Sequence, residues 1–179
     1  MRIIAWNIRC HRLRRTTVEQ LLQTNHIIAL QETKLKSKPA YGNNNTFFQP
    51  SEESGNAKRG LLIIVKKGIE CCQIKIPNNT NGVEALAVSL SLSGKKYVLV
   101  NMYVQCDSMK TPGDWEQALK PLLELGEHVI ITGDFNARSP LWHDTITNQN
   151  GRSLEEAYVS LNGILINSGG PTRYAERQA

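Results

Sequence analysis

The stretch "VIITGDFNARSPLW", residues 129–142, joins an apolar run directly to a set of polar side chains. Residues 129–131 are β-branched, as is typical of a buried strand, and a carboxylate and a carboxamide follow at Asp134 and Asn136. A core cannot accept such groups, but a rigid strand can hold them at its end. The pattern predicts a strand over 128–132 with chemically useful groups at its tip.

Three further predicted strands end in polar side chains. These strands and the residues at their ends are 1–6 with Asn7, 26–30 with Gln31 and Glu32, and 98–100 with Asn101 and Tyr103. Each ending has an ordinary structural explanation when taken singly, since Asp after Gly forms turns, a terminal Glu is solvated and a Tyr packs in the core. Four such endings in one chain indicate that the strand ends meet at one site.

The rest of the pattern predicts an α/β protein in which strands outnumber helices. Further strands are expected at 61–65, 83–92 and 164–166. A hairpin turn at 93–96 is expected to join 83–92 to the strand that contains 98–100, which extends over 97–104. Residues 37–45 are rich in Pro, Gly and Asn and are expected to form a loop. Helices interspersed as crossovers favour a layered α/β or sandwich arrangement over a purely parallel Rossmann sheet.

Three helix starts are expected from local signals. Thr16–Glu19 has the spacing of a capping box, Thr111-Pro112 places Pro at a first helical position, and Ser153 precedes an acidic first turn. Pro121 predicts a kink or an early end in the second of these helices.

Composition and charge narrow the class of protein. The 179 residues suit a single domain, 1–179, with 40% hydrophobic residues, and the apolar runs are too short to span a bilayer. No signal peptide is evident, so we expect an intracellular protein with four reduced cysteines and no structural metal. The net charge of +5 and a pI near 9.1 are compatible with a polyanionic partner.

The polar strand ends carry the groups needed for phosphodiester hydrolysis. Glu32 is a hard oxygen ligand suited to Mg²⁺ or Mn²⁺, and Asn7 can orient that carboxylate or a ligand water. Asp134 can act as a general base toward water, and Asn136 can hold the water or a phosphate oxygen in register. Tyr103 can donate a hydrogen bond to a non-bridging phosphate oxygen. The set predicts metal-assisted hydrolysis with in-line attack.

Four short motifs give the chain a family resemblance. They are "WN" at 6–7, "LQET" at 30–33, "NMYV" at 101–104 and "GDFNA" at 133–137. Their order and rough spacing resemble the endonuclease/exonuclease/phosphatase superfamily. "GDFNARSPLWHD", followed by "NGRSLEEA", "LNGILINSG" and "PTRY", resembles the apurinic/apyrimidinic-like endonuclease domain of jockey-like non-LTR retrotransposons.

The resemblance implies a fold and an activity. The fold would be a four-layered α/β sandwich of the DNase I-like kind, with two sheets face to face and helices outside. The activity would be Mg²⁺-dependent nicking of DNA, and it would leave a 3′-hydroxyl that primes reverse transcription. The implied partners are DNA and the reverse transcriptase domain of the same polyprotein, and a genomic substrate implies action in the nucleus.

Residue roles follow from the same resemblance. Glu32 would be the metal ligand with Asn7 as its partner, Tyr103 the phosphate contact, and Asp134 with Asn136 the pair that activates and positions water. Thr172, in "PTRY", would lie near the scissile strand. Arg9 stands where the superfamily often has an acidic or polar residue, and it would add a phosphate contact instead.

The sequence departs from the family pattern after "PTRY". The pattern continues with S-x-x-D and then Ser-Asp-His, whose His stabilises the pentacovalent phosphate, and the 179 residues contain neither motif. We therefore expect a domain that lacks its last strands and is catalytically impaired in this form. His143, the histidine nearest the site in sequence, is interpreted as a surface loop residue and not as a replacement.

Two alternatives stay open from the sequence. The first is a phosphoesterase of the same superfamily that acts on a small phosphorylated substrate. The second is an inactive nucleic-acid-binding remnant, whose phosphate contacts would come from basic side chains at positions 12, 14, 15, 58 and 59.

Overall fold

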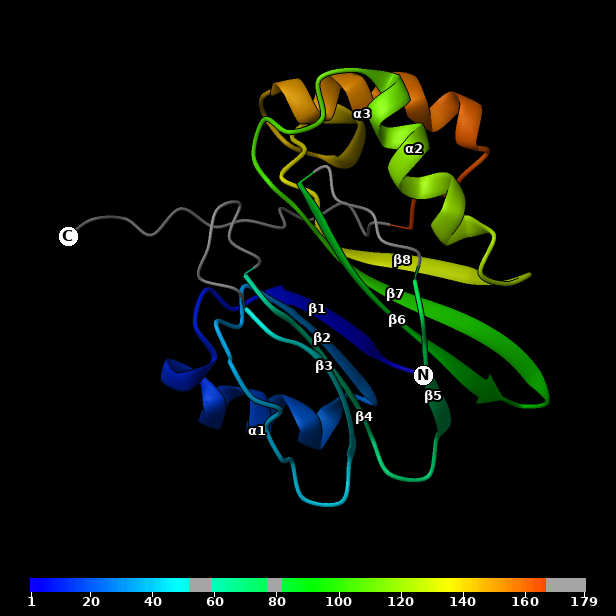
Figure 1. The fold of residues 1–179 in the computed structure, drawn as a ribbon. Helices are drawn as coiled ribbons and strands as arrows, with labels where there is room; N and C mark the ends of the chain where they lie inside the picture. The colour runs from blue at the N-terminus through cyan, green and yellow to red at the C-terminus, as the bar shows by residue number, and fades with distance from the viewer. Residues whose placement is uncertain (52–58, 77–81, 167–179) are drawn as a thin grey trace.

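The computed structural model describes residues 1–51, 59–76 and 82–166, in which eight strands form two four-stranded sheets (Figure 1). The strands are β1 (Ile3–Asn7), β2 (Ile27–Gln31), β3 (Asn45–Gln49), β4 (Leu61–Val65), β5 (Glu70–Ile74), β6 (Val83–Leu92), β7 (Lys95–Val104) and β8 (Val129–Asp134). The helices are α1 (Arg15–Thr24), α2 (Pro112–Leu123) and α3 (Gln149–Leu161), with short 3₁₀ turns η1 (His11–Leu13) and η2 (Pro140–Trp142).

The two sheets lie face to face with helices on their outer sides. The first sheet has the order β1-β2-β4-β3 and is covered by α1, and the second has the order β5-β6-β7-β8 and is covered by α2 and α3 (Figure 1). Within the sheets, β1 pairs parallel to β2 and β7 pairs parallel to β8. The predicted four-layered α/β sandwich is confirmed.

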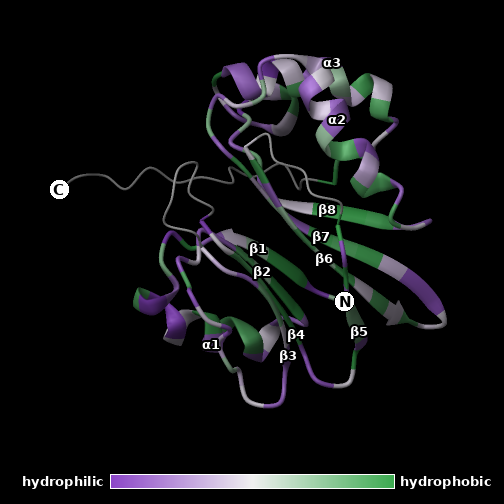
Figure 2. Ribbon diagram, viewed as in Figure 1, coloured by the Kyte–Doolittle hydropathy of each residue, from purple (hydrophilic) through white to green (hydrophobic). Residues whose placement is uncertain are grey.

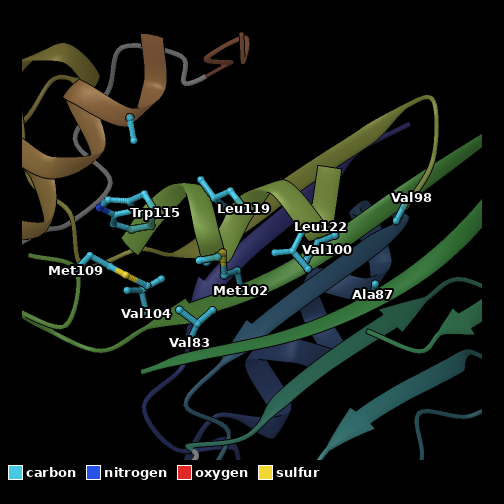
Figure 3. Close-up of a cluster of buried hydrophobic side chains, with 12 residues drawn as sticks. Val83, Ala87, Val98, Val100, Met102, Val104, Met109, Trp115, Leu119 and Leu122 are labelled. Atoms are coloured by element: carbon cyan, nitrogen blue, oxygen red, sulfur yellow. The ribbon is translucent and has the colours of Figure 1, made fainter. Parts of the chain in front are cut away.

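Alternating side chains explain why the second sheet can be covered on both faces. Leu86, Val88 and Leu90 of β6 pack against the first sheet, while Ala85 and Ala87 face the helices. The outer cluster joins this sheet to α2; its labelled members in Figure 3 are Val83, Ala87, Val98, Val100, Met102, Val104, Met109, Trp115, Leu119 and Leu122. Figure 2 shows hydrophobic residues concentrated along the strands and hydrophilic ones in the connecting loops.

Helix α2 follows the sequence prediction closely. Thr111 and Asp114 form a capping box, Pro112 occupies the first turn, and Trp115, Leu119 and Leu122 are buried. The helix tolerates Pro121 in its last turn and ends two residues later at Leu123.

No helix in the described ranges combines the length and apolar character needed to cross a membrane. All four cysteines are free thiols.

Two predicted helix starts are wrong. Helix α1 begins at Arg15, directly after η1, and no side chain caps it, so Thr16 lies inside the helix. Helix α3 begins at Gln149 because the side chain of Asn148 caps it by accepting from the amide of Gly151. Ser153 lies inside α3, where its hydroxyl accepts from Trp115 Nε1 and donates to the carbonyl oxygen of Met109.

One strand prediction is wrong, and two strands were not predicted. Residues 164–166 form no strand, and Ile164 and Ile166 are exposed, so an apolar run alone did not indicate pairing. No strand was predicted at β3, which follows an asparagine-rich loop, or at β5, which carries few apolar residues. Both are edge strands, which need only one paired neighbour and one packed face and therefore show a weak pattern.

The start of α3 is pressed against the loop that follows β8. A Cβ added at Gly151 would lie 1.8 Å from the carbonyl oxygen of Arg138, so only glycine fits. Asn148 adds three hydrogen bonds here: its Oδ1 accepts from the amides of Gly151 and Arg138, and its Nδ2 donates to the carbonyl oxygen of Asn136. The loop that carries Asn136 is therefore fixed by the helix behind it.

Gly151→Ala is expected to lower the free energy of unfolding by about 1–3 kcal/mol, because the methyl group forces the helix and the loop apart. Urea unfolding followed by circular dichroism measures this difference. Gly113→Ala is the matched control, since its Cβ would meet only Thr111 Oγ1, at 3.7 Å. Equal stability of the two variants would contradict the close approach described here.

Candidate active site

The ends of β1, β2 and β8 meet at one side chain. Asn7 Nδ2 donates to Glu32 Oε1 at 2.8 Å and to Asp134 Oδ2 at 2.6 Å. The two carboxylates come from different sheets and share one amide group. The polar strand ends that the sequence singled out are thus brought together across 127 residues of chain.

The direction of the Asn7 amide is set by its neighbours. Its Oδ1 accepts from the backbone amide of Arg9 at 3.1 Å, so its nitrogen faces the carboxylates. In this arrangement Asn7 orients the two carboxylates and does not present its oxygen to a cation. Arg9 has a positive φ of 57°, and its side chain is exposed.

Asp134 and Asn136 are fixed by a tight turn. The Asn136 amide donates to Asp134 Oδ1 at 3.0 Å, and the Asn136 side chain donates to the carbonyl oxygen of Val104 at 2.8 Å. Asn136 has φ 45°, a left-handed conformation that asparagine tolerates better than most residues. Each oxygen of Asp134 therefore has one protein donor, which sets its orientation and leaves acceptor sites open toward solvent.

Tyr103 lies in a row of residues across the second sheet. It is paired in register with Glu84 on β6 and with Asp134 on β8, so all three side chains project toward the first sheet. Burial, together with the negative charges of Glu32 and Asp134, raises the pKa of Tyr103 to about 12, against the opposing effect of Arg59. The phenol thus remains protonated and able to donate throughout the neutral range.

A buried amide pair joins the sheets beneath the site. Gln31 Nε2 donates to Asn101 Oδ1 at 2.6 Å, and Asn101 Nδ2 donates to the carbonyl oxygens of Leu30 and Leu62. Both side chains are almost completely buried. The sequence marked both residues as strand-end polar groups but gave them no role; they fix the spacing of the two sheets under Glu32 and Tyr103.

Two residues of the site were missed by the sequence analysis. Arg59 Nη1 lies 3.7 Å from Glu32 Oε2, and Glu84 binds the backbone just beside Arg59. The only sequence signal was a lone acid at position 84 in an otherwise apolar and small-residue strand. The sequence assigned Arg59 only to a possible phosphate-binding surface.

The sequence also singled out His143, Thr172 and a set of basic residues. His143 ends η2 in a left-handed conformation and is exposed, as expected for a loop histidine. Thr172 and Lys58 lie outside the described residues. Two of the basic residues at the N-terminal end already have structural partners, since Arg14 lies over the ring of Trp6 and Arg15 lies over Tyr41.

The donor set suits a hard divalent cation. Mg²⁺ binds through one or two carboxylates and takes its other ligands from water and substrate phosphate. Glu32 and Asp134 supply two carboxylates around one amide, and Glu32 is largely buried in a position fixed by Asn7. Across the described part of the chain no group of three or more His, Cys, Asp or Glu side chains is arranged to hold a metal, so a zinc-type cage is not formed there.

Residues 4–177 match the model of the Endonuclease/Exonuclease/phosphatase family. The chain belongs to this family. The match covers nearly the whole sequence and confirms the resemblance drawn from "LQET" and "GDFNA". Members of this family are hydrolytic nucleases and phosphatases.

The chain is also similar to individual proteins. It is 41% identical over 49 residues to the probable RNA-directed DNA polymerase from transposon BS of Drosophila melanogaster, a match covering 27% of this chain and 5% of that protein. The structure is similar to the endonuclease domain of TRAS1, a telomere-specific non-LTR retrotransposon, with a TM-score of 0.72 and 20% identity over 94% of this chain and 75% of that one.

An AP endonuclease from Archaeoglobus fulgidus shares the fold at a TM-score of 0.57 and 14% identity, covering 90% of this chain and 70% of that one. At these identities the two structures establish the fold alone.

The match to the curated relative covers a small part of that protein, and the structural match covers three quarters of the retrotransposon endonuclease domain.

Tyr103 is expected to titrate near pH 12, about two units above an exposed tyrosine, because burial disfavours the phenolate. Stability supplied by this shift is complete below pH 10 and is lost as the pH rises toward 12, since only the folded state then holds the proton. The absorbance at 295 nm is followed against pH for the wild type and for Tyr103→Phe, in folded and in urea-unfolded protein. The difference between the two proteins gives the titration of Tyr103 alone. A folded difference signal with a midpoint at pH 10 would contradict the burial of the hydroxyl.

Proposed function

We propose that this chain is a metal-dependent DNA endonuclease that nicks target DNA for retrotransposition. The observation that carries the proposal is the Asn7 amide that joins Glu32 to Asp134 at the ends of strands from both sheets. Family membership and the similarity to a retrotransposon endonuclease domain support it. The net charge of +5 supports a polyanionic substrate.

Glu32 would hold Mg²⁺ or Mn²⁺, and Asn7 would orient this carboxylate beside that of Asp134. When bound, the cation would supply Lewis-acid polarisation of the phosphate and neutralise developing negative charge. Asn7 contributes by keeping the two like-charged carboxylates side by side, because its amide hydrogens lie between them. This arrangement is set before any substrate arrives.

The other groups act on water and phosphate. Asp134 would accept the proton of the attacking water on a carboxylate whose Oδ2 is oriented by Asn7 and whose Oδ1 is oriented by the Asn136 amide. Asn136, anchored to the carbonyl oxygen of Val104, would keep the water or a phosphate oxygen in register. Tyr103 would donate its hydroxyl hydrogen to a non-bridging phosphate oxygen, a role that its raised pKa allows.

The substrate and partners follow from the same proposal. Arg9, together with Arg12 in η1, would contact the DNA backbone, and Thr172 would lie near the scissile strand. The similarity to a transposon polymerase suggests a reverse transcriptase domain of the same polyprotein as partner. Action on genomic DNA would take place in the nucleus.

Mg²⁺-dependent nicking of supercoiled plasmid is expected to be slow, because the 179 residues lack the family's Ser-Asp-His motif. Asp134→Asn is expected to abolish the nicking that remains, since the amide cannot accept the proton from water. The measurement is conversion to open circles with enzyme in excess over plasmid, with EDTA as the metal-free control. Ser160→Ala, on the helix that covers the outer face of the second sheet, is the matched control and should leave the rate unchanged.

The other readings make different predictions in the same assay. A small-molecule phosphoesterase would hydrolyse p-nitrophenyl phosphate and leave plasmid intact. A binding remnant would retain plasmid on a gel in a strongly salt-dependent way, with no nicking at any metal concentration. Either result would overturn the proposed endonuclease activity.

A further inference from the structure

Arg59 is held beside the candidate site by an unusually complete set of backbone contacts. Its amide donates to Glu84 Oε1 at 2.7 Å, and the amide of the next residue, Gly60, donates to Glu84 Oε2 at 3.0 Å. The carbonyl oxygens of Arg59 and Gly60 accept from the amides of Lys34 and Thr33. The segment is thus bonded on both sides, although the Arg59 side chain itself is half-exposed.

The close packing of Gly60 adds to this constraint. Gly60 has φ 84°, and an added Cβ would lie 2.8 Å from Thr33 Oγ1, a buried hydroxyl without a hydrogen-bond partner. The backbone at 59–60 therefore lies directly against the segment that carries Glu32. An ordinary surface ion pair does not require a backbone held by so many hydrogen bonds, since such pairs form between flexible, exposed side chains.

Glu84 links this segment to the rest of the site. It is buried on β6 and is paired in register with Tyr103, which is paired in turn with Asp134. A buried carboxylate is costly unless it is hydrogen-bonded, and here its two oxygens accept the two backbone amides. The position of the Arg59 backbone is therefore tied to the same row of residues that positions the proposed water-activating group.

The Arg59 guanidinium faces the carboxylate that Asn7 also binds. Its Nη1 lies 3.7 Å from Glu32 Oε2, on the oxygen that Asn7 does not contact. A cation bound to Glu32 would repel the guanidinium at this distance, whereas a phosphodiester brought in by that cation would attract it. The exposed side chain of Arg59 can turn from the carboxylate to the phosphate while its backbone stays fixed.

We propose that Arg59 is a phosphate-contacting residue, held by Glu84, that pairs with Glu32 until a divalent cation takes that carboxylate. The inference rests on the proposed endonuclease function and extends it to a residue outside the family motifs identified in the sequence. It makes Arg59 a counter-ion that exchanges partners as metal and substrate bind. Metal binding and DNA binding are then coupled through one side chain.

Arg59→Gln is the deciding variant, and it separates metal binding from DNA binding. Isothermal titration with Mn²⁺ alone should show affinity increased by about three- to tenfold, because a positive charge beside Glu32 is gone. Fluorescence anisotropy of a duplex DNA, measured in the Asp134→Asn background to prevent cleavage, should show weaker binding with Mn²⁺ present. Without metal the variant should bind DNA nearly as its parent does, since Arg59 is then paired with Glu32.

The salt dependence gives a second readout. With Mn²⁺ bound, the slope of log K against log salt should fall by about 0.9 in Arg59→Gln, as expected for one lost phosphate contact. Lys95→Gln is the matched control, because Lys95 carries the same charge at the other end of β7 from Tyr103. Glu84→Gln, which leaves one backbone amide without its acceptor, should reproduce part of the Arg59→Gln effect on Mn²⁺ affinity.

The outcomes separate this inference from the function on which it rests. If the wild type binds Mn²⁺ and nicks plasmid but Arg59→Gln behaves as Lys95→Gln does, the role of Arg59 is overturned and the endonuclease proposal stands. If Arg59→Gln weakens Mn²⁺ binding, Arg59 only supports Glu32 structurally and the exchange of partners is overturned. If the wild type neither binds Mn²⁺ nor nicks plasmid, the proposed function fails and the inference fails with it.

Discussion

The hydrogen bonds from one amide group to two carboxylates are the interaction on which the candidate site depends. Asn7 Nδ2 contacts Glu32 and Asp134, which belong to opposite sheets of the sandwich. Two like charges approach this closely at low cost only when donors or a cation lie between them. The amide supplies those donors in the protein itself, and a divalent cation would replace or reinforce them. The ends of strands from both sheets thus place two carboxylates close together, and the Asn7 amide offsets the repulsion between them.

The rest of the molecule serves to hold that point in place. Hydrophobic clusters between and outside the sheets fix the sheets face to face. The buried Gln31–Asn101 pair sets the distance between the sheets next to the site, because any shift would leave buried amides without partners. Behind Asp134, the Asn148 side chain and the close approach at Gly151 lock the following loop against α3. Rigid support of this kind is what catalytic geometry requires.

Much of the fold could be predicted from local pattern. Six of the eight strands in the described residues were expected, and the hairpin of β6 and β7 and the capping box of α2 follow directly from alternation and from Thr111-Pro112. The failures arose where a distant or competing neighbour, and not the local pattern, decides the structure. Thr16 and Ser153 carry the chemistry of a helix cap, but competing neighbours, η1 and Asn148, determine where the helices begin. The edge strands β3 and β5 are decided by pairing partners and not by their own composition.

The sequence by itself determined which chemical groups stand at the strand ends and to which family the motifs belong, because strand periodicity and motif spacing depend on residues a few positions apart. The tertiary structure decided which of those groups touch. Asn7 contacts Asp134, which lies 127 residues away in the sequence. The Asn7 nitrogen faces the carboxylates because the Arg9 amide binds the Asn7 oxygen. Glu84 holds the backbone of Arg59, whose side chain lies beside Glu32. These contacts depend on sheet register, on left-handed turns and on packing between layers, none of which is written in a local stretch of sequence.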